Sequence, residues 1–226
     1  MTGTHSVSAE GQVSAIAIDG PGGSGKSTVA KLVAETTGLP YLDTGAMYRA
    51  ITFGVLKRQI EPTDWQAIND VLHQIHIDLI GATVLVDGED VTDAIRGSDV
   101  TSHVSAVAAN PTLRHAMVGL QREWLKKRGG GVLEGRDIGT VVVPDAPLKV
   151  YVTASVRERA RRRALETDLD IDEVEADLAR RDKADSEREE SPLHAADDAV
   201  TIDTTDVDIA AVVDRIVTLA KERKLI

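Results

Sequence analysis

The residues from Gly20 to Ser27 form the pattern with the clearest chemistry in this sequence. They match GxxxxGK[ST], a loop that binds the phosphates of a nucleoside triphosphate. Glycines let backbone N–H groups turn toward phosphate oxygens, and the N-terminus of the following helix adds partial positive charge. Lys26 can reach the β- and γ-phosphates, and the Ser27 hydroxyl is a predicted ligand of Mg²⁺. The predicted triphosphate-binding residues are Gly20, Pro21, Gly22, Gly23, Ser24, Gly25, Lys26, Ser27 and Thr28.

Two further clusters could bind the acceptor of a phosphoryl group. In the first, Thr44 is a predicted helix N-cap, and Arg49 follows about one and a half turns later, able to face the phosphate loop. In the second, Arg136 and Asp137 follow a predicted strand at its carboxyl end, where α/β sheets place their ligands. A guanidinium suits a monophosphate because it can bind in a bidentate manner. Each cluster alone is also compatible with a solvated arginine, but with the phosphate loop they predict a second anion site.

Five arginines lie between positions 157 and 163 of a predicted helix. At 100° per residue they cannot share one face, and Arg159 and Arg163 fall together with Arg162. Like charges at this density are unfavourable unless anions neutralise them. One interpretation is that the helix closes over phosphates, so that Arg159 and Arg163 act with Lys26 as catalytic groups. The other interpretation is a solvated helix whose arginines pair with the acidic segment 166–177. Both interpretations can be true at once, for different arginines.

The composition restricts the partners of the chain. Its 226 residues include 26 lysines and arginines against 37 aspartates and glutamates, for a net charge of −11. Such a body repels nucleic acid and anionic membranes, so a phosphate site must be a local cationic pocket for a small ligand. There are no cysteines and no run of roughly 18 apolar residues, which favours a cytoplasmic protein. Residues 1–12 are polar and are predicted to form a flexible leader.

The elements that must position these groups alternate between short apolar runs and segments of helical spacing. This order predicts an α/β fold with a mainly parallel sheet. The predicted strands of that sheet cover 13–19, 39–42, 132–134, 148–153 and 199–202. The predicted helices cover 27–37, 45–59, 65–74, 101–128 with a break near Pro111, 157–164, 172–186 and 209–221. Residues 76–80 and 83–87 alternate like an antiparallel hairpin, which suits an insert carried on the main sheet.

The order of the motifs resembles that of the bacterial cytidylate kinases. From residue 13 to residue 226 the chain carries GPGGSGKST, LDTGAMYR, the hairpin insert, EGRDIGTVVVPDAPLK and RRDKADSERE. The resemblance implies a P-loop nucleoside monophosphate kinase fold with a five-stranded parallel sheet, in the order 2-3-1-4-5, flanked by helices. It implies one kinase domain, 13–226, with a monophosphate-binding insert at about 62–105 and a helical lid at about 155–187. The implied reaction is ATP + CMP (or dCMP) to ADP + CDP (or dCDP), with Mg²⁺, in a monomer.

The resemblance also implies the residues that bind the acceptor. At the acceptor phosphate it implies Thr44, Arg49 and Arg136. At the sugar and the neighbouring phosphate it implies Arg181, Asp185 and Arg188. At the base it implies Ser105, Arg114 and Asp137. Asp137 can accept a hydrogen bond from the cytosine amine, whereas uracil would set its O4 against this carboxylate. Arg114 can donate to the ring N3 and O2 of cytosine. The family often has serine at Thr44. Glu134 lies near the position at which P-loop proteins commonly have an aspartate that binds magnesium, but we do not assign it a role as a metal ligand.

Two alternatives remain open at this point. The first is a kinase of another small acceptor, such as UMP, AMP or shikimate, on the same fold. The second is a non-catalytic ATP switch, which would bind ATP without acceptor-dependent release of ADP. A GTPase is disfavoured because the guanine-reading sequence NKxD is absent: neither Asn69 nor Asn110 precedes a lysine. The histidines show no metal-ligand spacing, so no structural metal is expected.

Overall fold

A computed structural model of the chain describes residues 14–167 and 169–226. The predicted leader, 1–12, lies outside the described residues. Across the two described ranges, every helix is too short or too polar to span a lipid bilayer.

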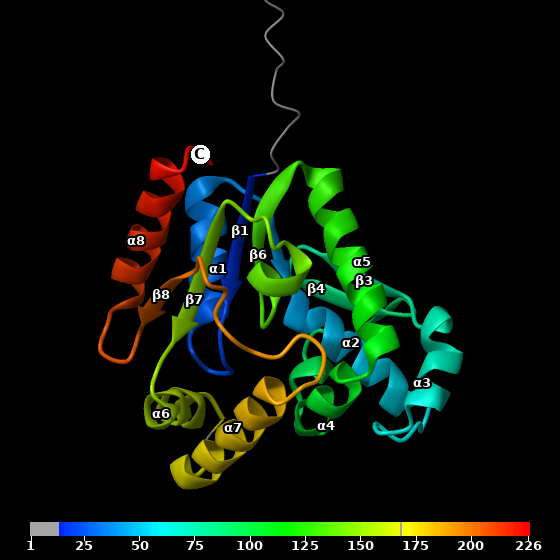
Figure 1. The fold of residues 1–226 in the computed structure, drawn as a ribbon. Coiled ribbons are helices and arrows are strands. Elements are labelled where there is room, and N and C mark those ends of the chain that lie inside the picture. The colour runs from blue at the N-terminus through cyan, green and yellow to red at the C-terminus, as the bar shows by residue number, and fades with distance from the viewer. Residues whose placement is uncertain (1–13, 168) are drawn as a thin grey trace, which may run out of the picture.

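The main sheet has five parallel strands. They are β1 (Ser14–Asp19), β2 (Tyr41–Asp43), β6 (Gly130–Gly135), β7 (Leu148–Thr153) and β8 (Val200–Asp203). The order across the sheet is β2-β6-β1-β7-β8, and numbering these strands alone along the chain gives the predicted 2-3-1-4-5. Because all neighbouring pairs are parallel, the carboxyl ends of the strands lie along one edge, which is the lower edge in Figure 1.

Alternate residues of the central strand face two different cores. Ala15 and Ala17 of β1 belong to one buried cluster, and Ile16 and Ile18 belong to the other. The helices on the two faces are α2 (Thr44–Lys57) and α5 (Pro111–Arg128) on the first, and α1 (Lys26–Thr37) and α8 (Ile209–Glu222) on the second. The period of two along a strand thus buries β1 on both sides, as expected for a parallel sheet between two helical layers.

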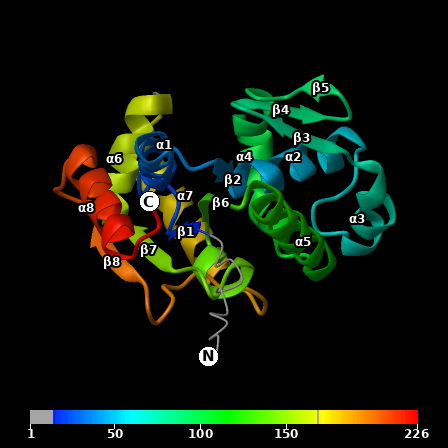
Figure 2. The same cartoon turned by 90° about the horizontal axis from the view of Figure 1, so that it is seen from above.

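An insert between α2 and α5 holds a second, smaller sheet (Figure 2). Its elements are α3 (Trp65–Val71), η1 (Leu72–Gln74), β3 (Ile77–Ile80), β4 (Thr83–Val86), β5 (Glu89–Asp90), η2 (Ala94–Arg96) and α4 (Ser98–Ala108). The antiparallel pairing of β3 with β4 confirms the predicted hairpin, whereas β5 and η2 were not predicted. The break near Pro111 is also confirmed, because Pro111 begins α5 under the side-chain cap of Asn110. The insert buries Ile75 and Val86 in the same core as Ile51 of α2.

Two helices lie below the carboxyl edge of the sheet in Figure 1. They are α6 (Val156–Thr167) and α7 (Ile171–Ser186). Ala160 and Ala164 of α6 pack with Val174 and Leu178 of α7 in a small cluster of their own. This cluster is separate from the two main cores of the sheet.

One turn of π-helix, η3 (Ile138–Val142), joins β6 to β7 and was not predicted from the sequence. The π-helical turn is rare and is frequently found at functional sites. Here it directly follows Arg136 and Asp137, and its N–H groups bond to the carbonyl of Asp137.

Candidate active site

The phosphate loop follows β1 at the carboxyl edge and leads into α1, as its sequence predicts. Gly20 cannot be replaced without moving the backbone, because a Cβ there would lie 2.0 Å from the carbonyl oxygen of Val152. Gly25 adopts a φ of 83° directly before the first residue of α1, a conformation that favours glycine. The glycines therefore allow a tight turn whose N–H groups and helix N-terminus can face an anion.

Lys26 lies over this loop rather than in solvent. Its Nζ donates to the carbonyl of Pro21 at 3.2 Å, and the side chain is buried. Burial, and then the charge of Arg136, lower the pKa of Lys26 well below its usual value, although Glu134 opposes the shift. A phosphate group bound in the loop would supply the missing anion and favour the charged form.

Ser27 and Glu134 bring two oxygens together at the start of α1. Ser27 Oγ donates to Glu134 Oε2 at 2.8 Å, and Tyr41 Oη donates to the other carboxylate oxygen at 2.5 Å. Burial, and then Asp43, raise the pKa of Glu134. Two adjacent oxygen ligands of an octahedral Mg²⁺ are about 3.0 Å apart, since each lies roughly 2.1 Å from the ion. The hydroxyl and carboxylate therefore fit Mg²⁺, which gives the unassigned Glu134 a candidate role.

Asp185 joins three of the predicted substrate-binding residues. Its carboxylate accepts from Arg136 Nε at 3.0 Å, from Arg188 and, at 3.4 Å, from Ser105 Oγ. Burial alone would raise the pKa of Asp185, but Arg136 and Arg188 hold it below its usual value. Residues from α4, from the end of β6 and from the C-terminal end of α7 are thus brought together around one buried carboxylate.

Two of the three residues predicted to bind the base, Arg114 and Asp137, contact each other directly. Arg114 Nη2 donates to Asp137 Oδ2 at 2.5 Å, and both side chains are almost fully buried. Arg114 also donates to the carbonyl of Ala108 and stacks over the ring of Tyr48, with 5.4 Å between its Cζ and the ring centroid. The Nε of Arg114 is buried and has no acceptor within hydrogen-bond distance among residues 14–167 and 169–226. The guanidinium of Arg114, a fixed donor, therefore lies beside the carboxylate of Asp137, a fixed acceptor.

Several arginines crowd together beside this pair. Burial and the charges of Arg181, Arg163 and Arg136 lower the pKa of Arg49 to about 10. Burial, followed by the charge of Arg136, likewise lowers the pKa of Arg181. The Nε of Arg181 is buried and has no hydrogen-bond acceptor in the part of the chain that the structure describes. Arg49 is held in place by the carbonyl of Ile95 at 3.0 Å and by the hydroxyl of Thr101 at 2.9 Å. Mutual repulsion of this kind is relieved when an anion binds among the cations.

Arg136 connects these arginines to the phosphate loop. A Cβ built on Gly22 would lie 3.5 Å from an Nη atom of Arg136, so the guanidinium lies directly against the loop. The charge of Arg136 also acts on both Lys26 and Arg181. The phosphate loop and the arginine cluster are therefore neighbours at one edge of the sheet.

The predicted role of Thr44 as an N-cap is wrong. Helix α2 begins at Thr44 itself, and its N-cap is Asp43, whose Oδ1 accepts from the N–H of Ala46 at 2.8 Å. The Thr44 hydroxyl is buried and donates to the carbonyl of Glu134 at 2.6 Å instead. Aspartate is as good an N-cap as threonine, and the extended backbone of Asp43 allows it to take that position.

Arg159 is buried at the base of the lid helices. Its guanidinium donates to the carbonyl of Gly22 at 3.0 Å and to Asp182 of α7 at 2.7 Å, and its Nε donates to the carbonyl of Ala154. It therefore ties α6 and α7 to the phosphate loop in this structure. The charge of Arg163, the second predicted lid arginine, acts on Arg49 and Arg181.

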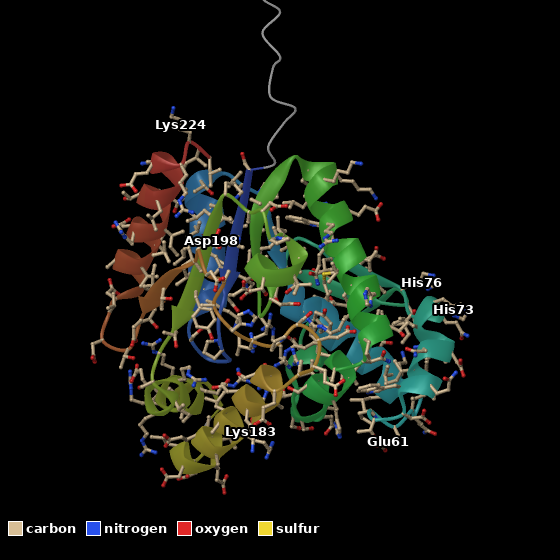
Figure 3. The ribbon with its side chains drawn as sticks, in the orientation of Figure 1. Glu61, His73, His76, Lys183, Asp198 and Lys224 are labelled. Carbon is tan, nitrogen blue, oxygen red and sulfur yellow. The ribbon has the colours of Figure 1, made fainter. Side chains whose placement is uncertain are left out.

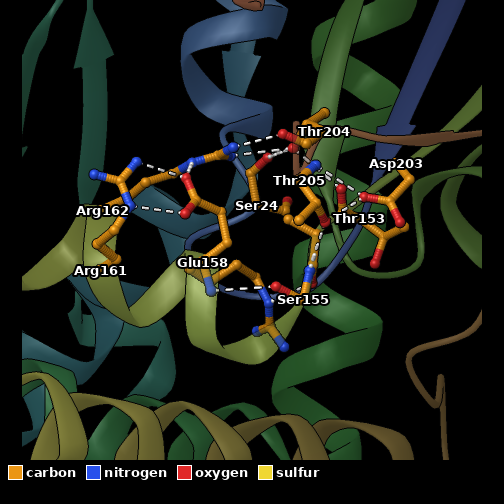
Figure 4. Close-up of polar contacts among 11 residues, drawn as sticks. Ser24, Thr153, Ser155, Glu158, Arg161, Arg162, Asp203, Thr204 and Thr205 are labelled. Atoms are coloured by element: carbon orange, nitrogen blue, oxygen red, sulfur yellow. Dashed lines mark hydrogen bonds and ion pairs between the residues drawn. The ribbon is translucent and has the colours of Figure 1, made fainter. Parts of the chain in front are cut away.

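A second link between α6 and the phosphate loop runs through Thr204 (Figure 4). Arg162 donates to the hydroxyl of Thr204 at 3.1 Å and to its carbonyl at 2.5 Å. The Thr204 hydroxyl lies 3.2 Å from the carbonyl of Ser24, to which it donates. Glu158 accepts from Arg161 and Arg162 on the same helix. Arg157 pairs with Asp172 and Glu175, which confirms the predicted pairing of this helix with the acidic segment 166–177.

Sequence reasoning missed two residues that hold η3. Asp19, the last residue of β1, accepts from the N–H groups of Ile138 at 2.8 Å and Gly139 at 2.7 Å. Arg122 of α5 donates to carbonyls at the other end of η3. The only local signal was a charged residue at the end of an apolar strand.

His73 and His76 are exposed on the insert, away from the phosphate loop (Figure 3).

Asp19 leads to a prediction about stability and pH. Burial raises its pKa from 3.8 to about 6, although the two N–H groups oppose the shift. A carboxyl whose folded pKa is raised binds its proton more tightly in the folded state, so folding weakens as pH rises between those values. Relative to the Asp19→Asn variant, the wild type should lose about 3 kcal/mol of unfolding free energy between about pH 4 and pH 7. Urea unfolding of both proteins across this range measures the difference, and a difference independent of pH would contradict the prediction.

Comparisons with known proteins agree with this geometry. The family model described as cytidylate kinase matches residues 16–222. A cytidylate kinase from Geobacillus sp. (strain WCH70) is 48% identical over 217 residues, covering 92% of this chain and 96% of that protein. A bifunctional pantoate ligase/cytidylate kinase from Synechococcus sp. (strain CC9902) is 50% identical over 219 residues, which cover 92% of this chain but 45% of that longer protein.

A solved gluconokinase from Sinorhizobium meliloti 1021 is similar in fold alone. It superimposes with a TM-score of 0.50 at 16% identity, covering 92% of this chain and 91% of its own. The structural similarity concerns the fold alone, whereas the sequence relatives identify a family. On the match of the family model and the identity to full-length relatives, the chain belongs to the cytidylate kinase family.

Proposed function

We propose that this protein transfers the γ-phosphoryl group of ATP to CMP or dCMP, with Mg²⁺, to give ADP and CDP or dCDP. The single observation that carries the proposal is the position of Arg136. It lies against Gly22 of the phosphate loop and is bonded to Asp185, which also holds Arg188. Two anions bound on its two sides would be adjacent, and in-line phosphoryl transfer requires this arrangement.

On the donor side, the loop 20–28 binds the phosphates of ATP through backbone N–H groups and Lys26. Lys26 exchanges the carbonyl of Pro21 for oxygens of the β- and γ-phosphates and neutralises charge on the transferring group. Ser27 and Glu134 are the residues that would hold Mg²⁺, directly or through its water ligands. When bound, the ion supplies further neutralisation of the phosphate charge.

On the acceptor side, the phosphate of CMP binds among Arg49, Arg136 and Arg181, near Thr44. Asp185 and Arg188 lie next to this cluster, where the sugar would bind. The cytosine amine donates to Asp137, while Arg114, with Ser105 nearby, donates to the N3 and O2 acceptors on the same edge of the base. No general base is required, because the acceptor phosphate is already an anionic nucleophile.

The lid, at about 155–187, and the insert, at about 62–105, are proposed to close on the two substrates. Closure excludes water, which would otherwise hydrolyse ATP. Arg163 then approaches the transferring phosphate. A catalytic contact by Arg159 requires its guanidinium to exchange the carbonyl of Gly22 for a phosphate oxygen.

A coupled assay for ADP tests the function. The purified protein is supplied with ATP and Mg²⁺, and with CMP, dCMP, UMP, AMP, shikimate or no acceptor. We expect release of ADP to depend on an acceptor, with CMP preferred over UMP by roughly tenfold or more. Release that does not depend on an acceptor, or that is fastest with AMP or shikimate, contradicts the proposal. Gel filtration of the same sample tests the predicted monomer.

A further inference from the structure

The turn η3 is held at both ends by side chains from two different elements. At its start, the two oxygens of Asp19 accept from Ile138 and Gly139 at 2.8 and 2.7 Å. At its end, Arg122 donates from Nε to the carbonyl of Val142 and from Nη2 to the carbonyl of Val141, both at 2.8 Å. An anion therefore lies at the free N–H groups of the turn and a cation at its free carbonyls, the arrangement that a helix dipole favours.

This turn directly follows the residues proposed to bind the acceptor. Asp137 precedes η3, and its carbonyl accepts from Val141 at 2.9 Å and from Val142 at 3.1 Å, inside the turn. A shift of η3 therefore moves the backbone of Asp137. A displacement of about 1 Å in a binding group is enough to lose much of its effect, since hydrogen bonds depend steeply on geometry.

The two holding residues connect the turn to elements that already carry the two substrate sites. Asp19 directly precedes Gly20, the first residue of the phosphate loop. Arg122 lies two turns along α5 from Arg114, so one helix contacts both Asp137 and the end of η3. The turn is thereby fixed relative to the ATP site through β1 and relative to the base-reading arginine through α5.

The free-energy cost of burying the charged carboxylate of Asp19 indicates that this side chain has a role beyond packing. Its carboxylate is buried, and within residues 14–167 and 169–226 it forms no ion pair with a lysine or arginine, although the charge of Lys26 acts on it. Burial raises its pKa because the charged form is poorly solvated. A neutral side chain would avoid that penalty, but it could not accept from two N–H groups with both oxygens.

We infer that Asp19 and Arg122 are positioning residues for the acceptor nucleotide, which act by fixing η3 and thus the direction of Arg136 and Asp137. The inference rests on the proposed function, because it concerns how CMP is bound. Arg122 gives the cleaner test, since it is remote in sequence from the phosphate loop and, among the described residues, its side chain donates to two backbone carbonyls.

The test compares Arg122→Ala and Arg122→Lys with a control, Lys126→Ala, which removes a cation from an exposed position one turn further along α5. We expect Arg122→Ala to raise the KM for CMP about tenfold and to reduce the preference for CMP over UMP, with the KM for ATP changed less than about twofold. Arg122→Lys should recover part of the loss, because an ammonium can still donate to one of the carbonyls. Lys126→Ala should match the wild type.

A purely structural role for Arg122 predicts a different result. The variant would then unfold at a lower temperature and lose kcat through a smaller folded fraction, while the KM for CMP and the CMP:UMP preference stay unchanged. That result would refute the inference. Wild-type activity is measured first with CMP, so failure of the proposed function is recognised independently of the variants.

A double mutant provides a second measurement. If Asp19 and Arg122 act on the same turn, the effects of Asp19→Asn and Arg122→Ala on the KM for CMP should not add in the combined variant. Amide hydrogen exchange at residues 138–142 should also be faster in each single variant than in the Lys126→Ala control. Additive effects, or unchanged exchange at the turn, would contradict a shared action through η3.

Discussion

Replacement of Lys26 by methionine is expected to lower kcat on the order of 10³-fold, with the protein still folded. The ammonium is proposed to neutralise charge that develops on the transferring phosphoryl group, and no other side chain in the loop 20–28 is cationic. Removal of such a group acts mainly on the transition state, so kcat should fall more than the affinity for ATP. Steady-state kinetics with saturating CMP measure the effect.

The burial of Lys26 makes this variant a clean one. Burial and Arg136 already lower the pKa of the amine, so an apolar side chain of similar length removes a poorly solvated cation. The temperature of unfolding should therefore be equal to or higher than that of the wild type. Lys31→Met, at a position further along α1, is the matched control and should keep its turnover. If Lys26→Met kept more than about a tenth of the wild-type kcat, the assignment of Lys26 would be wrong.

Replacement of Asp137 by asparagine is expected to reduce the preference for CMP over UMP roughly 10- to 100-fold. The carboxylate can only accept, which suits the cytosine amine and opposes the O4 of uracil. An amide has both an acceptor and a donor, so it can face either base. The ratio of kcat/KM for CMP to that for UMP is the measured quantity.

Asparagine is preferable to alanine at this position because of Arg114. The two side chains are buried together, and truncation to alanine would leave the guanidinium without its partner, at a cost of about 3–5 kcal/mol. Asp137→Ala should therefore lose stability as well as CMP affinity. Asp145→Asn makes the same chemical change at an exposed position between η3 and β7, and should leave the preference intact. An unchanged CMP:UMP ratio in Asp137→Asn would show that another group reads the base.

Much of the fold could be predicted from the sequence because it depends on local patterns. Apolar runs of strand length and the period of helices located all five strands of the main sheet and its flanking helices to within a few residues. The phosphate loop was recognisable because its glycines are required by backbone geometry, as the contact between Gly20 and Val152 illustrates. The predicted order of the strands followed from the resemblance.

The details of the site were less predictable, because they depend on contacts between distant parts of the chain. Ser27 and Glu134 are 107 residues apart, and Asp19 and Gly139 are 120 apart. Neither pair has a local signature. The misassigned N-cap at Thr44 has a related cause: Asp43 and Thr44 are both good N-caps, and the contact of Thr44 with the distant Glu134 decides between them.

By itself, then, the sequence determined which groups could do chemistry: the phosphate loop with Lys26, and arginines and aspartates in the order of a known family. Only the tertiary structure decided which of them share a site. It set Arg136 between Gly22 and Asp185, paired Arg114 with Asp137, and fixed η3 between Asp19 and Arg122. The physical reason is that hydrogen bonds and charges act over a few ångströms, and only the packing of β1, β6 and α5 brings these residues within that range.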